Sequence, residues 1–244
     1  MIGFRRLGVV ATVILLRHAR SSANGAGVLA GRTPGVGLDE AGLGQAAGLV
    51  GRLAGVPVAA VVSSPLRRCR QTVAPLVADR GLSVVWDGRL AEVDYGEWTG
   101  RKLSSLAKES LWRVVQAHPS AAVFPGGEGL AGVQARAVAA VRAHGERVVA
   151  EHGDGAVWVV CSHGDVIKAV LADALGVHLD SFQRIVVDPC SLSVVRYTDT
   201  RPFVLRVNDM GGDLSGLVPP KPRGKRRSRK KAGSDAVVGG STGG

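Results

Sequence analysis

The chain has 244 residues, of which 45% are hydrophobic and 21% are charged, and this composition excludes a disordered or fibrous protein. Aromatic residues make up 4%, so the core must be packed mainly with Val, Ala and Leu, as in buried strands covered by helices. The formal net charge is +11, but eight Lys and Arg residues lie between Lys221 and Lys231, and residues 1–217 hold 23 bases and 19 acids. The body of the chain is therefore only mildly basic, and most of the excess charge lies near the C-terminus.

Cysteine usage and hydropathy narrow the class further. Cys69, Cys161 and Cys190 are odd in number and widely spaced, which supports neither a disulfide framework nor a zinc site. The apolar run Leu7–Leu16 follows two arginines, as in a signal peptide, but it has about half of the ~20 residues needed to span a bilayer. We expect it to be a buried first strand in a cytoplasmic protein, with no membrane partner, no metal and no cofactor.

The pattern of apolar residues predicts an α/β fold. Short apolar runs alternate with longer amphipathic segments, which is typical of a mostly parallel sheet with crossover helices. The expected strands are Thr12–Leu16, Ala59–Ser63, Ser83–Trp86 and Val157–Ser162. The expected helices are Glu40–Leu53, Leu66–Asp79, Val133–Glu151 and Val166–Leu175. Near the end, Ser191–Tyr197 and Phe203–Asn208 flank a polar turn and predict a hairpin at the edge of the sheet.

The first expected helix carries the clearest signals. Asp39 precedes it and belongs to the residue types that cap helix N-termini. Leu43, Ala47, Val50 and Ala54 recur at helical spacing and predict one apolar face.

The composition also divides the chain. From Gly211 onward, Pro, Gly, Ser and basic residues dominate, which is typical of disorder. We therefore expect an N-terminal extension over residues 1–11, one domain over residues 12–210 and a disordered basic tail over residues 211–244.

Three expected strands end in residues suited to phosphate chemistry. These are Arg17 and His18 after the first strand, Ser63, Ser64, Arg67, Arg68 and Arg70 after the second, and Ser162, His163 and Gly164 after the fourth. Open α/β sheets bind ligands outside the carboxyl ends of their strands, so these side chains should meet at one edge. Because the donors of arginine match phosphate oxygens, the sequence predicts a site for a dianion there.

Five ordered blocks of the sequence resemble the histidine phosphatase superfamily, also called the phosphoglycerate mutase-like family. Residues 16–24 are similar to its signature Arg-His-Gly-x-[Ser/Thr]-x-x-Asn, with Ala19 in place of the glycine and Arg20 where Glu is common. In the second block, over residues 63–72, an Arg lies four residues after Ser and four before Thr, which selects Arg68. The remaining blocks are residues 90–100 with the acid at Glu92, residues 125–128 followed by Arg136, and residues 161–164.

The resemblance implies a fold and a mechanism. The fold would be a three-layer αβα sandwich with an antiparallel edge hairpin. An insertion between Tyr95 and Gly132 would lie over the site and set substrate choice. It includes Trp98, Trp112, Phe124 and Arg101. The enzyme would be a metal-independent phosphomonoesterase for small phosphorylated metabolites, working through a phosphohistidine. The roles implied are nucleophile for His18, phosphate binding for Arg17, Arg68, His163, Asn24 and Gly164, and proton transfer for Glu92. Asp165 departs from the small apolar residue expected there, and we expect it to cap the following helix.

Two alternatives stay open. A phosphoglycerate mutase-type phosphotransferase would need more cations than the scattered Arg101, Lys102, Lys108 and Arg113 of the insertion. A binder of nucleic acid or another acidic partner would use the basic tail, which lacks aromatics for stacking.

Overall fold

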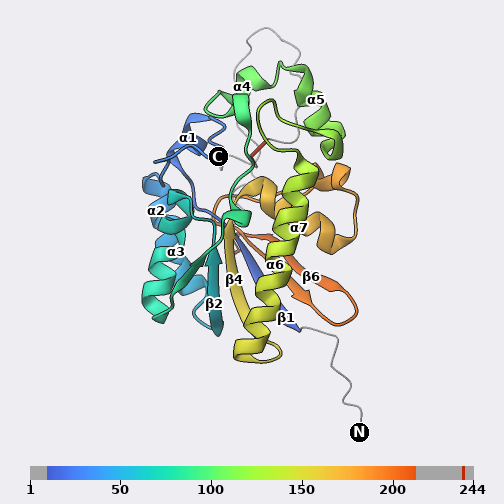
Figure 1. Ribbon diagram of the computed structural model, residues 1–244. Coiled ribbons are helices and arrows are strands. Elements are labelled where there is room, and N and C mark those ends of the chain that lie inside the picture. Colours follow the sequence, from blue (N-terminus) through green and yellow to red (C-terminus); the bar gives the residue numbers. More distant parts are fainter. Residues whose placement is uncertain (1–9, 213–237, 240–244) are drawn as a thin grey trace.

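The computed structural model describes residues 10–212 and 238–239, and its described part is built on one twisted sheet (Figure 1). The strands are β1 (Ala11–Arg17), β2 (Val58–Ser63), β3 (Val84–Trp86), β4 (Val157–Ser162), β5 (Leu192–Tyr197) and β6 (Pro202–Asp209), in the order β3-β2-β4-β1-β5-β6. The pairs β1–β4, β2–β4 and β2–β3 are parallel, whereas β5 runs antiparallel to both β1 and β6. The predicted parallel sheet with an antiparallel edge hairpin is confirmed.

Helices cover both faces of the sheet, as Figure 1 shows. The helices are α1 (Ser22–Ala26), α2 (Glu40–Arg52), α3 (Arg67–Arg80), α4 (Leu103–Leu106), α5 (Ser110–Ala117), α6 (Leu130–His152) and α7 (Gly164–Leu175). Short 3-10 helices occupy Gly88–Leu90, Gly96–Trp98, Pro119–Ala121 and Leu179–Arg184. The short helices α4 and α5 belong to the insertion, which lies beyond the carboxyl ends of the strands.

Successive side chains of β1 point to opposite faces of the sheet and so contribute to two separate cores. Val13 and Leu15 point to one face, where α6 and α7 cover them, because successive strand residues face opposite sides. Ile14 and Leu16 point to the other face and pack against α2 and α3. The three-layer αβα arrangement follows from this double burial.

The predicted apolar face of the first helix is wrong by one position. Asp39 caps α2 as expected, since its carboxylate accepts a hydrogen bond from the backbone N–H of Gly42 at 2.9 Å. The buried side, however, is formed by Gly42, Ala46 and Leu49, and Leu43 is 51% exposed. A Cβ on Gly42 would lie 1.9 Å from the carbonyl oxygen of Arg20, so the helix packs through a glycine that a hydropathy pattern overlooks.

The expected ends of the chain fall mostly outside the described residues. Of the predicted extension and basic tail, the structure describes residues 10–11, 211–212 and 238–239. The last two, Val238 and Gly239, lie beside the candidate site (the short red segment in Figure 1). Among the described helices, none has the length and apolar character needed to cross a membrane.

Candidate active site

The carboxyl ends of β1, β2 and β4 bring the predicted site residues together. Arg17 is the last residue of β1, and the backbone N–H of His18 donates to the carbonyl of Ser162 at the end of β4. Arg68 lies in the first turn of α3, which follows β2, and His163 is the N-cap residue of α7. All four predicted side chains are buried, so their charges and tautomers are fixed by neighbours rather than by water.

His18 is held in one tautomer. Its Nδ1 lies 2.8 Å from the carbonyl oxygen of Ala19, which can only accept, so Nδ1 carries the proton. Its Nε2 accepts from Nε of Arg68 at 3.2 Å and therefore holds a lone pair. Burial and the positive charges of Arg68 and Arg17 hold the pKa of His18 well below its usual value of 6.5. The imidazole is thus neutral at neutral pH, with Nε2 as its basic atom.

Arg68 organises the pocket through several bonds. Its Nη2 donates to the carbonyl of Gly31 at 2.8 Å and to Nδ1 of His163 at 3.1 Å. Because a guanidinium only donates, Nε2 of His163 must carry the proton, which it shares with the hydroxyl of Ser64 at 2.8 Å. Nη1 of Arg68 is buried and has no partner among the described residues. A buried cationic N–H without a partner is suited to an anionic ligand.

Glu92 is a buried carboxyl group in the same pocket. Its Oε1 accepts from the backbone N–H of Val93 at 3.0 Å, and its Oε2 lies 3.9 Å from Nδ1 of His163. Its backbone carbonyl accepts from Arg32 at 2.8 Å and Arg136 at 3.3 Å, which fixes its place. Burial, reinforced by the charge of Asp165, raises the pKa of Glu92 to about 7, although Arg68 opposes the shift.

The other predicted ligands lie around this group. Burial lowers the pKa of Arg17 to about 10, so it stays charged at neutral pH, and its Nη1 donates to the carbonyl of Val187 at 2.7 Å. Asn24 lines the pocket, but its side-chain oxygen accepts from the backbone and hydroxyl of Ser21 in a capping box, which leaves the amide nitrogen as donor. Gly164 is buried as the first residue of α7.

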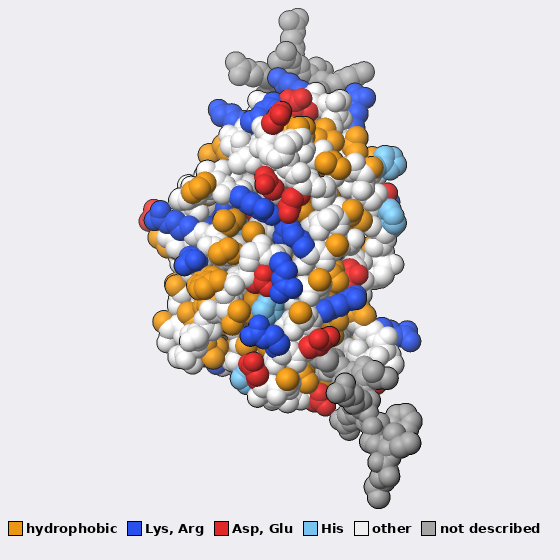
Figure 2. All heavy atoms as spheres, viewed as in Figure 1, with side chains coloured by type: hydrophobic (Ala, Val, Ile, Leu, Met, Phe, Trp, Pro, Cys, Tyr) orange, Lys and Arg blue, Asp and Glu red, His pale blue; other side chains and the backbone are white. Residues whose placement is uncertain are grey.

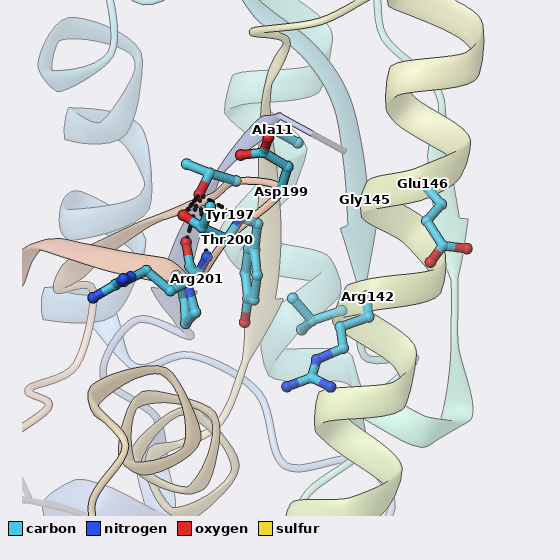
Figure 3. A pocket seen from close by; sticks show the side chains of 11 residues that line it. Ala11, Arg142, Gly145, Glu146, Tyr197, Asp199, Thr200 and Arg201 are labelled. Atoms are coloured by element: carbon cyan, nitrogen blue, oxygen red, sulfur yellow. Dashed lines mark hydrogen bonds between the residues drawn. The ribbon is translucent and has the colours of Figure 1, made fainter. Parts of the chain in front are cut away.

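Of these groups, His18, Asn24, Arg68 and Glu92 line one small pocket of about 30 Å³, whereas Arg17, His163 and Gly164 are not among its lining residues. The lining residues are His18, Ser21, Asn24, Val28, Leu29, Ala30, Gly31, Arg68, Glu92, Tyr95, Leu103, Val238 and Gly239. A larger hollow of about 300 Å³ lies between the start of β1, α6 and the turn that joins β5 to β6 (Figure 3). Ala11 lines that hollow, and it is separated from His18 by the length of β1, roughly 20 Å at ~3.3 Å per residue. The larger hollow holds none of the predicted site residues, so the smaller pocket is the candidate site.

The insertion contributes less to the pocket than expected. Trp98, Trp112 and Phe124 are buried against one another inside the insertion, and none of them lines the pocket within the described residues. Arg101 pairs with Glu109 instead of facing the site. The three aromatics belong to the core cluster that also contains Leu15 of β1, and the effect of the insertion on substrate choice stays a prediction.

Asp165 does not cap α7. The helix begins at Gly164, so Asp165 lies inside its first turn, where it is fully buried. Its Oδ2 accepts from the hydroxyl of Tyr95 at 2.8 Å and from the backbone N–H of Gly239 at 2.9 Å, and Nζ of Lys168 lies 3.6 Å from Oδ1. The sequence marks Asp165 as unusual, but Tyr95 and Gly239 come from distant segments and could not be deduced from spacing.

Ser64 and Thr72 also support the site, although in the sequence they served only as spacing markers for Arg68. The hydroxyl of Ser64 accepts from Nε2 of His163 at 2.8 Å, and the hydroxyl of Thr72 accepts from the backbone N–H of Ala19 at 2.9 Å. Both residues belong to the sequence block that selected Arg68, so the sequence pointed to them but did not indicate which groups they would bind.

Comparison with known proteins assigns the family. A model of the histidine phosphatase superfamily (branch 1) matches residues 13–210. The chain belongs to the histidine phosphatase superfamily. The resemblance drawn from the five sequence blocks is therefore confirmed, and so is the assignment to a family of phosphate-transfer enzymes.

Relatives in this superfamily include both hydrolases and mutases. The chain is 32% identical to phosphoserine phosphatase 1 of Hydrogenobacter thermophilus, over 80% of this chain and 91% of that one. It is 30% identical to a Yersinia pestis protein named "Probable phosphoglycerate mutase GpmB", over 85% of this chain and 95% of that one. Among solved structures, YhfR of Bacillus stearothermophilus superposes with a TM-score of 0.73 at 25% identity, over 85% of this chain and all of that one.

Proposed function

We propose that this histidine phosphatase hydrolyses small phosphomonoesters without a metal, through a phosphohistidine on His18. The observation that carries the proposal is a pocket lined by His18, Arg68 and Glu92, in which Nε2 of His18 is basic and Nη1 of Arg68 has no partner among the described residues. Each of the three is in the state that phosphoryl transfer requires at neutral pH.

The steps follow from these states. Nε2 of His18 attacks phosphorus, and the bond between phosphorus and the ester oxygen breaks. Arg17, Arg68 and the N–H of Asn24 stabilise the equatorial oxygens, where negative charge gathers. Protonated Glu92 gives its proton to the departing alkoxide. The resulting carboxylate then takes a proton from the water that attacks phospho-His18, which releases inorganic phosphate and restores both groups.

His163 is neutral before substrate binds. Burial, followed by the charge of Arg68, holds its pKa well below 6.5, and its Nδ1 accepts from Arg68. We assign it to aligning Arg68 in the free enzyme. A bound phosphate dianion favours protonation of the ring, so His163 becomes a further phosphate donor only in the complex.

The charge around the pocket favours hydrolysis over a mutase reaction. A mutase holds a bisphosphorylated intermediate and needs a second group of cations for its far end. Arg68 is the cation among the described residues that line the pocket, whereas Arg101 and Arg32 pair with Glu109 and Glu128.

Phosphate release tests the proposal. The purified protein is incubated with phosphoserine, sugar phosphates, phosphoglycerates and nucleoside monophosphates, and inorganic phosphate is measured with and without EDTA. We expect release from at least one of them at an unchanged rate in EDTA. Absence of release from every ester, or loss of activity in EDTA that added metal restores, would contradict the proposal.

A second assay separates the two reactions. The protein is given 3-phosphoglycerate with a trace of 2,3-bisphosphoglycerate. Rapid formation of 2-phosphoglycerate without phosphate release would assign the mutase reaction instead.

A further inference from the structure

Two residues near the C-terminus lie in the catalytic pocket. Val238 and Gly239 line it together with His18 and Glu92, although the next described residue before them is Gly212. Val238 is 1% exposed and belongs to the same core cluster as Leu29, at the side of the pocket. The segment is therefore packed into the site rather than resting on its surface.

Two hydrogen bonds attach Gly239 to the catalytic edge of the sheet. Its N–H donates to Oδ2 of Asp165 at 2.9 Å, and its carbonyl accepts from Nη2 of Arg17 at 3.1 Å. The bond to Arg17 acts with the bond from Arg17 to Val187 to fix the plane of the guanidinium. Asp165 is fully buried, so the N–H of Gly239 also compensates part of its desolvation.

Position 239 suits glycine for two reasons. Its φ is +82°, a conformation that other residues adopt at a cost. A Cβ there would also lie 3.1 Å from Cδ1 of Leu29, which is buried. The backbone thus approaches the pocket wall closely enough to bond both Asp165 and Arg17.

We propose that Val238 and Gly239 form a permanent wall of the active site that determines which ester group fits and that positions Arg17. This inference rests on the proposed hydrolysis. The wall is apolar, since Val238 lies with Val28, Leu29 and Leu103 around the pocket. It therefore selects compact, weakly polar ester groups, and Asp165 is the residue that holds the wall in place.

The geometry favours a wall over a plug that must leave before substrate binds. Among the described residues, the hydrogen bonds of Gly239 go to Asp165 and Arg17, and none goes to Nε2 of His18 or to Arg68. A small cavity of about 30 Å³ remains beside His18, Arg68 and Glu92 with the dipeptide in place. The dipeptide therefore engages Nη2 of Arg17, but it leaves Nε2 of His18 and the guanidinium of Arg68 without a hydrogen bond to Gly239.

Two full-length variants that change only the volume at position 238 test the wall. Val238→Ala widens the pocket and Val238→Leu narrows it, and kcat/KM is measured for phenyl phosphate and the larger 1-naphthyl phosphate. We expect the naphthyl-to-phenyl ratio to rise about 10-fold or more in Val238→Ala and to fall by a similar factor in Val238→Leu, because one methylene in a pocket contributes about 10–200-fold. A merely structural role would lower both esters together and would not shift the ratio in opposite directions.

Gly239→Ala tests the positioning of Arg17. A displaced carbonyl loosens a hydrogen bond to a charged group, and such a bond contributes about 1.5–3 kcal/mol, so KM should rise roughly 10–100-fold for both esters. A chain in which the eight bases of residues 221–231 are serine is the matched control and should behave like wild type. Unchanged ratios in both Val238 variants would overturn the inference. A higher kcat on both esters in Gly239→Ala would also overturn it, because it would show that the segment blocks the site as a plug. Failure of the wild type to hydrolyse any ester would instead refute the proposed function.

Discussion

His18 and Glu92 lie in one pocket, yet their pKa values are shifted in opposite directions. Burial disfavours the charged form of each, so it lowers the pKa of the imidazole and raises that of the carboxyl group. Arg68 adds to the first shift and reduces the second. The outcome is a neutral imidazole beside a carboxyl group with a pKa of about 7, which is the pairing that the proposed cleavage of a phosphate ester needs.

Replacing Glu92 with Gln should affect substrates according to their leaving groups. An alkyl alkoxide must be protonated as it departs, whereas p-nitrophenolate leaves without help. We expect Glu92→Gln to lose most of the about 10²–10⁴-fold contribution of a general acid on an alkyl phosphate, and far less on p-nitrophenyl phosphate, in single-turnover measurements. Equal losses for both esters would show that Glu92 is not the acid.

The same substitution should stabilise the fold in a pH-dependent way. The pKa of Glu92 is about 7 in the folded chain against a usual value of 4.5, so between these values the folded state holds a proton that the unfolded state has lost. Stability contributed by Glu92 is therefore full below pH 4.5 and lost as the pH rises to 7, a difference on the order of 3 kcal/mol. Glu92→Gln removes this loss.

Thermal unfolding at two pH values measures the effect. The Tm of Glu92→Gln relative to wild type should be clearly higher at pH 8 than at pH 4.5. An equal Tm difference at both pH values would mean that the carboxyl group is not held in its protonated form.

At the scale of elements, the packing of α2 reaches the catalytic loop through one glycine. A Cβ on Gly42 would lie 1.9 Å from the carbonyl oxygen of Arg20, two residues after His18. Gly42→Ala must push the helix and this loop apart, so we expect a loss of about 1–3 kcal/mol of stability and a lower kcat.

Gly48→Ala is the matched control in the same helix. Gly48 is exposed, and a Cβ there meets nothing within 4 Å. This substitution should stabilise the protein by up to about 1 kcal/mol through helix propensity and leave kcat unchanged. If both variants behaved alike in urea unfolding and kinetics, the close approach of α2 to Arg20 would be contradicted.

The sequence predicted elements well where apolar runs are bounded by polar residues. Val157–Ser162 was predicted with both ends correct, and the end of the strand containing Ala59–Ser63 was also correct. The helix predicted from Val133 begins three residues earlier, at Leu130, because glycines around its start lower the helical signal. The short helix α1 was missed, since its five residues have no helical periodicity and depend on a capping box.

At the scale of the whole molecule, the residues of the candidate site could be named from the sequence, but their supports could not. His18, Arg68 and His163 follow strands whose parallel order places them at one edge. The carbonyls of Gly31 and Val187 leave no side-chain signal, because any residue supplies a carbonyl. The approach of Val238 and Gly239 to the site depends on the path of the chain and not on a local pattern.

The charges of the described residues are distinct from those of the predicted basic tail, because residues 221–231 lie outside the described part of the chain. On the face shown in Figure 2, basic and acidic side chains are interspersed, consistent with a mildly basic body. The bases of residues 221–231 lie outside the described residues, so an acidic partner for the tail stays a prediction.

Changing all eight bases of residues 221–231 to serine should abolish any salt-dependent binding to a polyanion, measured by titration at two salt concentrations. It should leave kcat/KM for phosphomonoesters unchanged, measured by phosphate release. A large fall in kcat/KM would show that the tail's charge takes part in catalysis.

Trapping the covalent intermediate tests the central claim most directly. The protein is mixed with a ³²P-labelled phosphomonoester and quenched within one turnover, and the labelled peptide is mapped by mass spectrometry, with His18→Ala as the control. We predict one phosphate on His18, labile in acid and stable in alkali as a phosphoramidate is, and no labelling or turnover in His18→Ala. Label on another residue, or near wild-type turnover in His18→Ala, would contradict the mechanism.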